Sequence, residues 1–291
     1  MNDINIFCFG FGQVAKNFIR KLSIKEYNII LTTTSRSESS KKFFNGIHYN
    51  SYLFNSDKFD KNLQSKLKEA DYILVSIPPE KQKDLVIKNF SRFIENSKAK
   101  WITYLSATSV YGDHKGEWVN ENSEANPTSK KGIARLKAEN AWVSLERNYK
   151  LPIQIFRLSG IYSNEKNTLI RLRSGDMKLI DKKNHYFSRI HVDDIANLLF
   201  KSLSKFKSGE IYNISDDKPS SSKEVTLFGA KILNITNVEK IEVNEIKNEI
   251  LKNFYNESKK VSNEKVKKFF NYKLKFPSYI EGLNYIRDNF I

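Results

Sequence analysis

Apolar runs and helical faces alternate along the chain from its first residues. Ile4 to Phe9 is a short, β-prone apolar run, which predicts one buried strand. A helical pattern follows at once, with its apolar positions on one face: Val14, Ala15, Phe18, Ile19 and Leu22. The turn between them reads Gly10-x-Gly12-x-x-Ala15. Strand, glycine turn and helix in this order are typical of dinucleotide binding.

Each small residue of this turn has a predicted role. Gly10 permits a tight turn, Gly12 lets a pyrophosphate approach the backbone, and Ala15 lets the helix pack closely on the strand. The start of the helix offers free N–H groups to the phosphates. We therefore expect cofactor contacts from Gly10, Phe11, Gly12, Gln13 and Val14. The alternative is an ordinary turn between a strand and a helix.

A second apolar run, Tyr27 to Thr34, predicts the next strand and ends in Ser35-Arg36-Ser37. In a dinucleotide fold this strand end faces the adenosine ribose, where an acidic residue binds the 2′-hydroxyl of NAD. A guanidinium flanked by hydroxyls suits a 2′-phosphate instead, so the sequence favours NADP over NAD. Glu38 argues against this choice, and a solvated Arg36 is the alternative interpretation.

Later segments continue the alternation and predict an α/β fold with a doubly wound, mostly parallel sheet. The predicted strands are 47–54, 72–77, 101–105, 153–158 and 210–215, and the clearest helices are 60–69, 82–95 and about 130–147. In the predicted helix 130–147, one face carries Ile133, Leu136, Trp142 and Leu145, with Ala141 beside them. Ligands lie beyond the carboxyl ends of such strands. Further cofactor contacts are therefore expected from Ser76, Ile77, Pro78 and Ser106.

Composition narrows the class of protein. A chain of 291 residues with 40% hydrophobic and 13% aromatic content can bury a large core. Cys8 is the only cysteine, which excludes an intrachain disulfide and a cysteine-rich metal site. We find no pattern of a signal peptide or spanning run at the start, so we expect a cytoplasmic protein without a membrane partner.

The net charge of +16 raises the question of a nucleic-acid partner. Lysines are spread through the whole chain, and the densest groups are short and interrupted by acids. Such a distribution is typical of a solvated exterior. We therefore do not expect nucleic-acid binding as the main function, and expect the charge to attract a negatively charged small substrate or cofactor.

Several motifs beyond the glycine turn occur in order along the chain. They lie at 105–112 (Leu-Ser-Ala-Thr-Ser-Val-Tyr-Gly), 156–162, 189–194, 209–216 and 276–283, with Glu121 in a loop between them. Together they resemble the extended short-chain dehydrogenases/reductases of the NAD(P)-dependent epimerase/dehydratase family. The resemblance implies hydride transfer on a sugar nucleotide or similar polar metabolite. It also implies a nucleotide domain of residues 1–162 plus about 187–216, and a smaller substrate domain of about 163–186 and 217–291.

The catalytic pattern of that family does not carry over to this chain. The resemblance places Ala107 where relatives have Ser or Thr, Lys131 at the tyrosine position and Arg135 at the lysine position. Arg135 could still supply charge and contact the ribose, whereas Lys131 could serve as acid/base only if buried. The candidate catalytic residues are Thr108, Lys131 and Arg135. The alternative for Thr108, Ser106 and Tyr111 is that they only cap the strand end.

His191, Asp193 and Asp194 lie just before a helical pattern. A histidine with two acids is compatible with a metal or a base, but we favour a structural role in which an Asp caps the helix. His48, His114 and His185 lie in other segments without ligand spacing, so we expect no metal.

Three functional hypotheses remain open from the sequence. The first is an NAD(P)-dependent enzyme with a non-standard active site, and the second is an NADP-binding sensor or scaffold without turnover. The third is an RNA-binding protein on the same fold, which the net charge alone motivates. Many relatives pair through two long helices, here 82–95 and 130–147, so the resemblance also suggests a homodimer.

Overall fold

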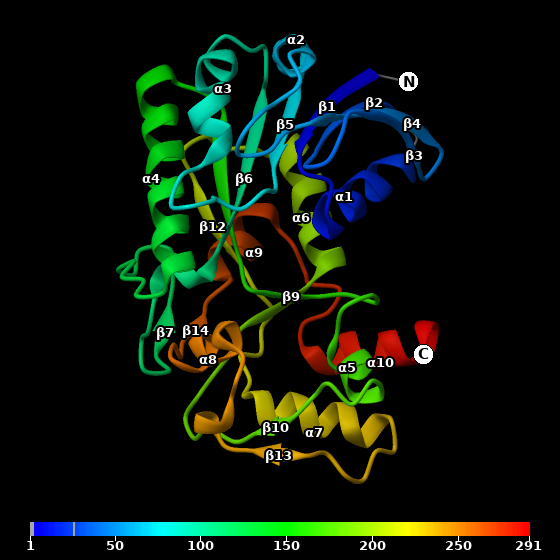
Figure 1. The fold of residues 1–291 in the computed structure, drawn as a ribbon, viewed down its shortest axis with the longest axis vertical. Coiled ribbons are helices and arrows are strands. Elements are labelled where there is room, and N and C mark those ends of the chain that lie inside the picture. The colour runs from blue at the N-terminus through cyan, green and yellow to red at the C-terminus, as the bar shows by residue number, and fades with distance from the viewer. Residues whose placement is uncertain (1–2, 26) are drawn as a thin grey trace. The chain divides into compact units, whose positions relative to one another are not determined.

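The computed structural model describes residues 3–25 and 27–291 and contains two compact units (Figure 1). The first unit comprises Met1–Ala107, Ile133–Arg157 and Ile195–Tyr212. The second comprises Thr108–Gly132, Leu158–Asp194 and Asn213–Ile291. Each unit is therefore assembled from segments that are distant in sequence. These boundaries differ from the expected ones mainly because residues 108–132 and 158–162 group with the later segments.

An eight-stranded sheet dominates the fold, in the order β12-β8-β6-β5-β1-β2-β4-β3. Its strands are β1 (Asp3–Phe9), β2 (Asn28–Ser35), β3 (Ser40–Phe44), β4 (Ile47–Leu53), β5 (Tyr72–Val75), β6 (Trp101–Ala107), β8 (Ile153–Leu158) and β12 (Ile211–Ile214). The pairs β1–β2, β1–β5, β2–β4 and β5–β6 are parallel. The predicted α/β class is confirmed, and the five predicted strands after β2 are present within one or two residues.

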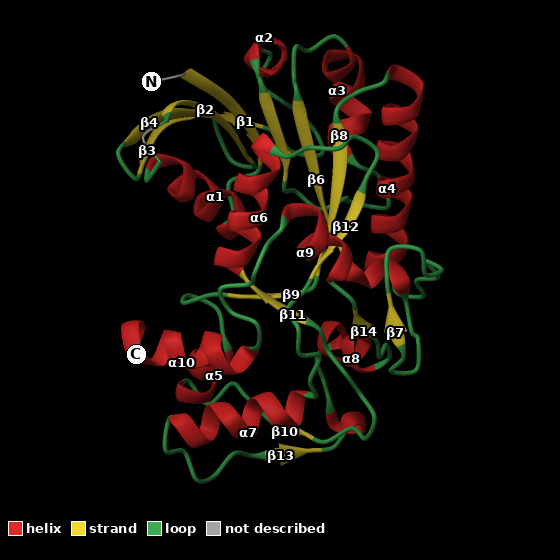
Figure 2. Ribbon diagram, turned by 180° about the vertical axis from the view of Figure 1, so that it is seen from behind, coloured by secondary structure: helices red, strands yellow, loops and turns green. Residues whose placement is uncertain are grey.

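The helices that accompany this sheet are drawn in red in Figure 2. They are α1 (Gln13–Ser23), α2 (Asn62–Glu69), α3 (Leu85–Glu95), α4 (Lys130–Tyr149) and α6 (Val192–Ser204). Phe7 and Phe9 of β1 pack in one hydrophobic cluster with Leu63 of α2, Phe90 of α3 and Trp142 of α4. On α1 all five predicted apolar positions are buried. Burial of these side chains fixes α1 directly after the glycine turn.

Helix α3 was predicted to begin at Gln82, and this is wrong. Lys81 and Gln82 have φ values of +45° and +64°, which an α-helix does not allow. Asp84 instead caps the helix, because its carboxylate accepts the N–H groups of Val86 at 2.8 Å and Ile87 at 3.0 Å. The helix therefore begins at Leu85.

The apolar face predicted for α4 is rotated in the structure. Trp142 and Leu145 are buried as expected, but Ile133 and Leu136 are only partly buried. Small residues, Ala134 and Ala138, take the buried positions on the first half of the helix. Their small size lets this half of α4 approach its neighbours closely.

Strand β3 has no counterpart in the sequence prediction. It forms a hairpin with β4, antiparallel, with Phe43 opposite His48 and Lys41 opposite Asn50. The run Ser-Lys-Lys-Phe-Phe lacks an alternating apolar pattern because β3 is a largely exposed edge strand. A helix is the usual connection between neighbouring parallel strands, so this hairpin leaves part of the sheet without a covering helix.

The second unit consists of short elements. They are the 3₁₀ turns η1 (Thr108–Tyr111) and η2 (Val243–Glu245), the strands β7 (Trp118–Val119), β9 (Gly160–Tyr162), β10 (Leu179–Ile180), β11 (Arg189–His191), β13 (Lys240–Ile241) and β14 (Lys260–Val261), and the helices α5 (Thr168–Arg173), α7 (Ser222–Ile232), α8 (Glu249–Tyr255), α9 (Glu264–Phe270) and α10 (Tyr279–Phe290). The pairs β9–β11, β10–β13 and β7–β14 are parallel. Helices α5, α7 and α10 share a core around Leu169, Val225 and Leu283.

A buried ion pair between Arg157 and Glu139 gives a test of the first unit. The Arg157 guanidinium donates to Glu139 at 2.7, 3.1 and 3.2 Å. Glu139→Ala would leave this cation buried without its carboxylate. We expect urea unfolding to show a loss of about 3 kcal/mol. The matched control is Glu69→Ala, which removes the exposed pair with Lys66 and should cost less than about 1 kcal/mol. Equal losses of unfolding free energy in the two variants would contradict the assignment of Arg157 and Glu139 as a stabilising buried ion pair.

Candidate functional site

The glycine turn after β1 is held by the ends of two neighbouring strands. The Gly10 N–H donates to the Thr34 hydroxyl on β2 at 2.8 Å. The hydroxyl of Ser76, next to β5, donates to the carbonyls of Phe9 at 2.9 Å and Gly10 at 3.3 Å. Gly10 has φ +84°, and a Cβ there would lie 2.7 Å from Cγ2 of Ile77. Only glycine therefore fits this position.

The start of α1 is open. Gly12 is its N-cap residue and provides no side-chain cap, and the first turn contains no acidic residue. A Cβ placed on Gly12 would meet no atom within 4 Å. The backbone N–H groups at this end are the ones that an α-helix leaves without a partner of its own. The Val14 side chain is buried, so this residue has only its backbone to offer a ligand.

Phe11, between the two glycines, anchors the turn on the β3–β4 hairpin. Its ring lies 5.3 Å from that of Phe44, edge to face, and 5.2 Å from that of Tyr49. Lys16 and Arg20 of α1 lie over the Phe44 ring at 6.0 and 5.6 Å. Sequence reasoning missed this aromatic anchor because the hairpin itself was not predicted.

The end of β2 presents polar groups to solvent. Ser35 and Ser37 share a hydrogen bond between their hydroxyls at 3.1 Å, and the carbonyl of Arg36 accepts from Asn55 at 3.1 Å. Arg36 is exposed, and within residues 3–25 and 27–291 its guanidinium has no hydrogen bond or ion pair. Glu38 is also exposed and makes no ion pair with Arg36 in this part of the chain. The guanidinium is therefore free to bind an anion.

Ser106 lies at the carboxyl end of β6, in the same unit as the glycine turn. Its side chain is 3% exposed, and its hydroxyl has no hydrogen-bond partner among the described residues. Leaving a buried hydroxyl unpaired costs free energy, so this atom is suited to a ligand contact.

Arg135 of α4 is fixed against β6. Its Nη1 donates to the Leu105 carbonyl at 2.8 Å and to the Tyr104 hydroxyl at 3.2 Å. The Tyr104 ring stacks on Trp142, whose indole N–H donates to Asp84 at 3.0 Å. Burial raises the pKa of the Tyr104 phenol above its ordinary range, so it stays protonated at neutral pH. Arg135 thus brings a cation to the end of β6.

The other two candidate catalytic residues have no comparable setting. Lys131 is exposed, so the burial that its acid/base role requires is absent. Thr108 is partly buried in η1. Tyr111 is buried and donates to the Asn213 side chain at 2.8 Å, which gives it a structural contact.

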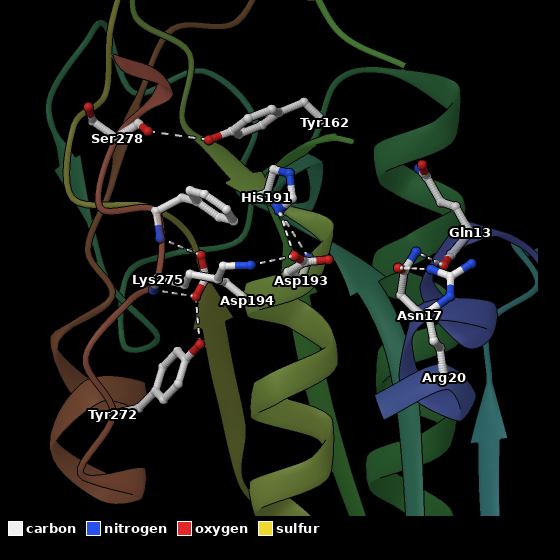
Figure 3. Close-up of polar contacts among 11 residues, drawn as sticks. Gln13, Asn17, Arg20, Tyr162, His191, Asp193, Asp194, Tyr272, Lys275 and Ser278 are labelled. Atoms are coloured by element: carbon white, nitrogen blue, oxygen red, sulfur yellow. Dashed lines mark hydrogen bonds and ion pairs between the residues drawn. The ribbon is translucent and has the colours of Figure 1, made fainter. Parts of the chain in front are cut away.

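His191, Asp193 and Asp194 make polar contacts within the second unit (Figure 3). The expected Asp cap of α6 is wrong, because both acids lie inside its first turn and the Asp193 N–H donates to Nδ1 of His191 at 3.2 Å. Asp194 accepts from the Tyr272 hydroxyl and from the backbone N–H groups of Lys275 and Phe276 at 2.5, 2.7 and 3.0 Å. Asp194 thereby ties the segment before α10 to the start of α6.

A second polar group in the same unit surrounds Arg189. Its Nη1 donates to the carbonyls of Phe187 and Ser220, both at 3.0 Å. Burial raises the pKa of Asp216 to about 8, although the nearby Arg189 lowers it. Oδ2 of Asp216 has no partner within the described residues. A carboxyl group with a pKa in this range can hold or release a proton near neutral pH.

Among the described residues, no group of three or more His, Cys, Asp or Glu side chains could hold a metal ion. No helix among them combines the length and apolar character needed to cross a membrane.

Comparison with known proteins identifies the relatives of this chain. Residues 85–215 match the model of the NAD dependent epimerase/dehydratase family. The predicted family resemblance is confirmed. A dTDP-D-glucose 4,6-dehydratase from Dictyostelium discoideum is 26% identical over 163 residues, which cover 49% of this chain and 36% of that relative. The match thus spans little more than a third of the relative's length.

Solved structures of similar fold extend over almost the whole chain. A conserved protein of unknown function from Silicibacter pomeroyi DSS has a TM-score of 0.85 and 28% identity, covering 99% of both chains. UDP-glucuronic acid 4-epimerase from Bacillus cereus, in complex with NAD, has a TM-score of 0.75 and 15% identity, again covering 99% of both. dTDP-glucose 4,6-dehydratase from Bacillus anthracis str. Ames, in complex with NAD, has a TM-score of 0.76 and 17% identity, covering 98% of this chain and 97% of that one. The chain has the fold of the epimerase/dehydratase family.

The buried His191 predicts how stability depends on pH. Burial lowers the pKa of His191 from 6.5 to about 4, and its Nδ1 accepts a hydrogen bond. Between these values the unfolded chain binds the proton more readily, so stability falls as the pH falls below 6.5. Between about pH 7 and pH 5 we expect the free energy of unfolding of the wild type to fall by about 2 kcal/mol more than that of His191→Asn. Asn keeps a hydrogen-bond acceptor but does not titrate. Denaturant melts at each pH measure this, and parallel curves for the two proteins would refute it.

Proposed function

We propose that the protein binds NADP(H) at the turn from Gly10 to Gly12 and acts as an epimerase/dehydratase-like oxidoreductase. One observation carries the proposal: a turn that only glycine fits leads directly into an uncapped helix start with free space above Gly12. Backbone N–H groups at such an end favour the negative charge of a pyrophosphate. An ordinary turn would not need this combination.

The chain's residues fit a dinucleotide at several points. Phe11, Gly12 and Gln13 present backbone at the turn, while Ser76 and Ile77 support Gly10 from the end of β5. Ser106 lies at the carboxyl end of β6, which is parallel to β5 and adjacent to it. The carboxyl ends of parallel strands meet at one edge, so its unpaired hydroxyl is available to the same ligand. Pro78 directly follows Ile77 and ends the proposed contact segment after β5.

We propose NADP rather than NAD because of the end of β2. The exposed guanidinium of Arg36 lies between Ser35 and Ser37, whose hydroxyls are bonded to each other. A guanidinium and hydroxyls together recognise a phosphate group, which only NADP carries at the ribose 2′-position. Glu38 does not neutralise Arg36 through an ion pair within the described residues.

The proposed chemistry is transfer of a hydride between a carbinol carbon and the nicotinamide. Arg135 keeps a fixed positive charge at the end of β6 and is the candidate to contact the ribose or an oxyanion. Thr108 follows Ala107, which lacks a hydroxyl, and is the candidate to hold the reacting hydroxyl of the substrate. Lys131 is the weakest of the three candidates because it is exposed.

The proposed substrate is a sugar nucleotide or a similar anionic metabolite. Relatives of similar fold are named for UDP-glucuronic acid and dTDP-glucose. The net charge of +16 attracts such anions. Assays of nicotinamide absorbance with UDP-glucuronic acid and dTDP-glucose are therefore the first substrate screen.

Parallel fluorescence titrations with NADPH and NADH test the cofactor proposal. We expect preferential NADPH binding. Arg36→Ala should weaken the affinity for NADPH about ten-fold, because one charged hydrogen-bond partner of the phosphate is lost. The affinity for NADH should change less than about two-fold. Arg92→Ala, an exposed arginine on α3, is the matched control and should change neither. Equal weakening of both cofactors by Arg36→Ala would refute NADP selectivity, and binding of neither would refute the site.

A sensor or scaffold without turnover is the second candidate function. Ala107 and the exposed Lys131 favour it, because both stand where a catalytic group is expected from the family resemblance. This hypothesis predicts cofactor binding but no change in nicotinamide absorbance with any sugar nucleotide. One verified turnover that Arg135→Ala abolishes would exclude it and support the enzyme.

A further inference from the structure

Arg135 is held against β6 through one nitrogen of its guanidinium. This nitrogen, Nη1, donates to the Leu105 carbonyl at 2.8 Å and to the Tyr104 hydroxyl at 3.2 Å, which uses both of its N–H groups. The N–H groups of Nε and Nη2 make no hydrogen bond or ion pair within residues 3–25 and 27–291. Because the Arg135 side chain is only partly buried, the edge formed by Nε and Nη2 is available to a ligand.

Neither Glu139 nor Asp84 neutralises Arg135 through an ion pair. Glu139 lies one helical turn further along α4, a spacing at which Arg and Glu often pair. Its carboxylate instead accepts three hydrogen bonds from Arg157. Asp84 accepts from two backbone N–H groups at the start of α3 and from the indole of Trp142. Arg135 therefore keeps its positive charge for a ligand.

The Tyr104 hydroxyl has Arg135 as its only hydrogen-bond partner among the described residues. The Tyr104 side chain is fully buried, and its ring stacks on Trp142 with 5.7 Å between the centroids. Burying a hydroxyl costs free energy unless it is hydrogen-bonded, and a phenylalanine ring would fill the same space without that cost. The presence of the hydroxyl is therefore explained by Arg135 rather than by packing of the core.

Strand geometry places Arg135 next to Ser106, a proposed cofactor contact. Side chains two residues apart on a strand point to the same side, so Tyr104 and Ser106 share one side of β6. Arg135 contacts Tyr104 on this side and also binds the carbonyl of the peptide that joins Leu105 to Ser106. The buried hydroxyl of Ser106 has no partner among the described residues. A ligand that contacts Ser106 therefore lies beside the guanidinium.

The order of the strands indicates which half of a dinucleotide reaches this place. The glycine turn follows β1, and the proposed 2′-phosphate contact follows β2. Strand β6 lies on the other side of β1, beyond β5. A dinucleotide with its pyrophosphate at the turn and its adenosine at β2 extends its nicotinamide half across the ends of β5 and β6. The nicotinamide ribose is therefore the part expected beside Arg135.

We propose that Tyr104 is a positioning residue, which holds Arg135 so that its Nε and Nη2 groups bind the two hydroxyls of the nicotinamide ribose. Two parallel N–H donors suit two neighbouring oxygen acceptors. Tyr104 itself does not touch the ligand, because its side chain is fully buried. This role rests on the proposed function, since it belongs to the same cofactor site.

Calorimetric titrations with NADPH and with adenosine 2′,5′-bisphosphate test the proposal. The second compound keeps the 2′-phosphate and one 5′-phosphate of NADP but lacks the nicotinamide ribose. We expect Arg135→Ala to weaken the affinity for NADPH about ten-fold, and Tyr104→Phe to weaken it about five-fold. The affinity for adenosine 2′,5′-bisphosphate should change less than about two-fold in both variants, because this compound does not reach Arg135.

A double-mutant cycle separates positioning of Arg135 from a general effect on the core. When Arg135 is replaced by Ala, the Tyr104 hydroxyl has no guanidinium to hold. Tyr104→Phe in the Arg135→Ala background should therefore change the NADPH affinity less than about two-fold. The matched control is Tyr72→Phe, which removes a hydroxyl from the first residue of β5, at the opposite end of the sheet from the proposed site. This variant should change the affinity for neither compound.

Two kinds of result would overturn the role of Tyr104 and leave the cofactor site standing. One is an NADPH affinity that Arg135→Ala or Tyr104→Phe leaves unchanged. The other is a loss that adds fully in the double variant, or an equal loss for adenosine 2′,5′-bisphosphate, since either would assign the Tyr104 hydroxyl to stability of the core. Failure of the wild type to bind either compound would overturn the proposed function itself, and the role of Tyr104 with it.

Discussion

The hydrogen bonds that fix the turn at Gly10 connect the parts of the proposed nucleotide site. Thr34 holds the N–H of Gly10 from β2, and Ser76 holds its carbonyl from β5, so the turn joins the strands on both sides of β1. The ends of β2 and β5 carry the residues proposed to contact the ribose and the rest of the cofactor. A change in this turn would therefore displace the start of α1 and both flanking strand ends together.

The region around the candidate catalytic residues differs from the pattern that the family resemblance implies, and the contacts of Arg135 show how the fold accommodates the difference. Arg135 is bound to the β6 backbone and to Tyr104, while Tyr104, Trp142 and Asp84 form a connected group down to the start of α3. A guanidinium is thereby fixed in place without a proton-donating role. Ala107 supplies no hydroxyl nearby. This combination supports retained nucleotide binding with altered chemistry.

Most of the fold could be predicted because buried strands give strong sequence signals, as β8 shows: its bounds, Ile153–Leu158, agree with the prediction. The start of α3 was missed because Lys81 and Gln82 adopt positive φ values that the apolar pattern does not reveal, although Asp84 before the apolar run was an available cap signal. Strand β3 could not be predicted, because an exposed edge strand has no alternation of apolar and polar residues. The burial of Ser106 and the exposure of Lys131 depend on tertiary packing, which sequence spacing does not specify.

Hydrogen exchange of backbone amides, measured with and without NADPH, tests the central claim most directly. We expect saturating NADPH to slow exchange at Phe11 to Val14 and at Arg36 and Ser37, where the pyrophosphate and the 2′-phosphate are proposed to bind. The amide of Gly10 should change least, because it already donates to Thr34. Protection confined to other segments, or no protection at the glycine turn at saturation, would contradict the account.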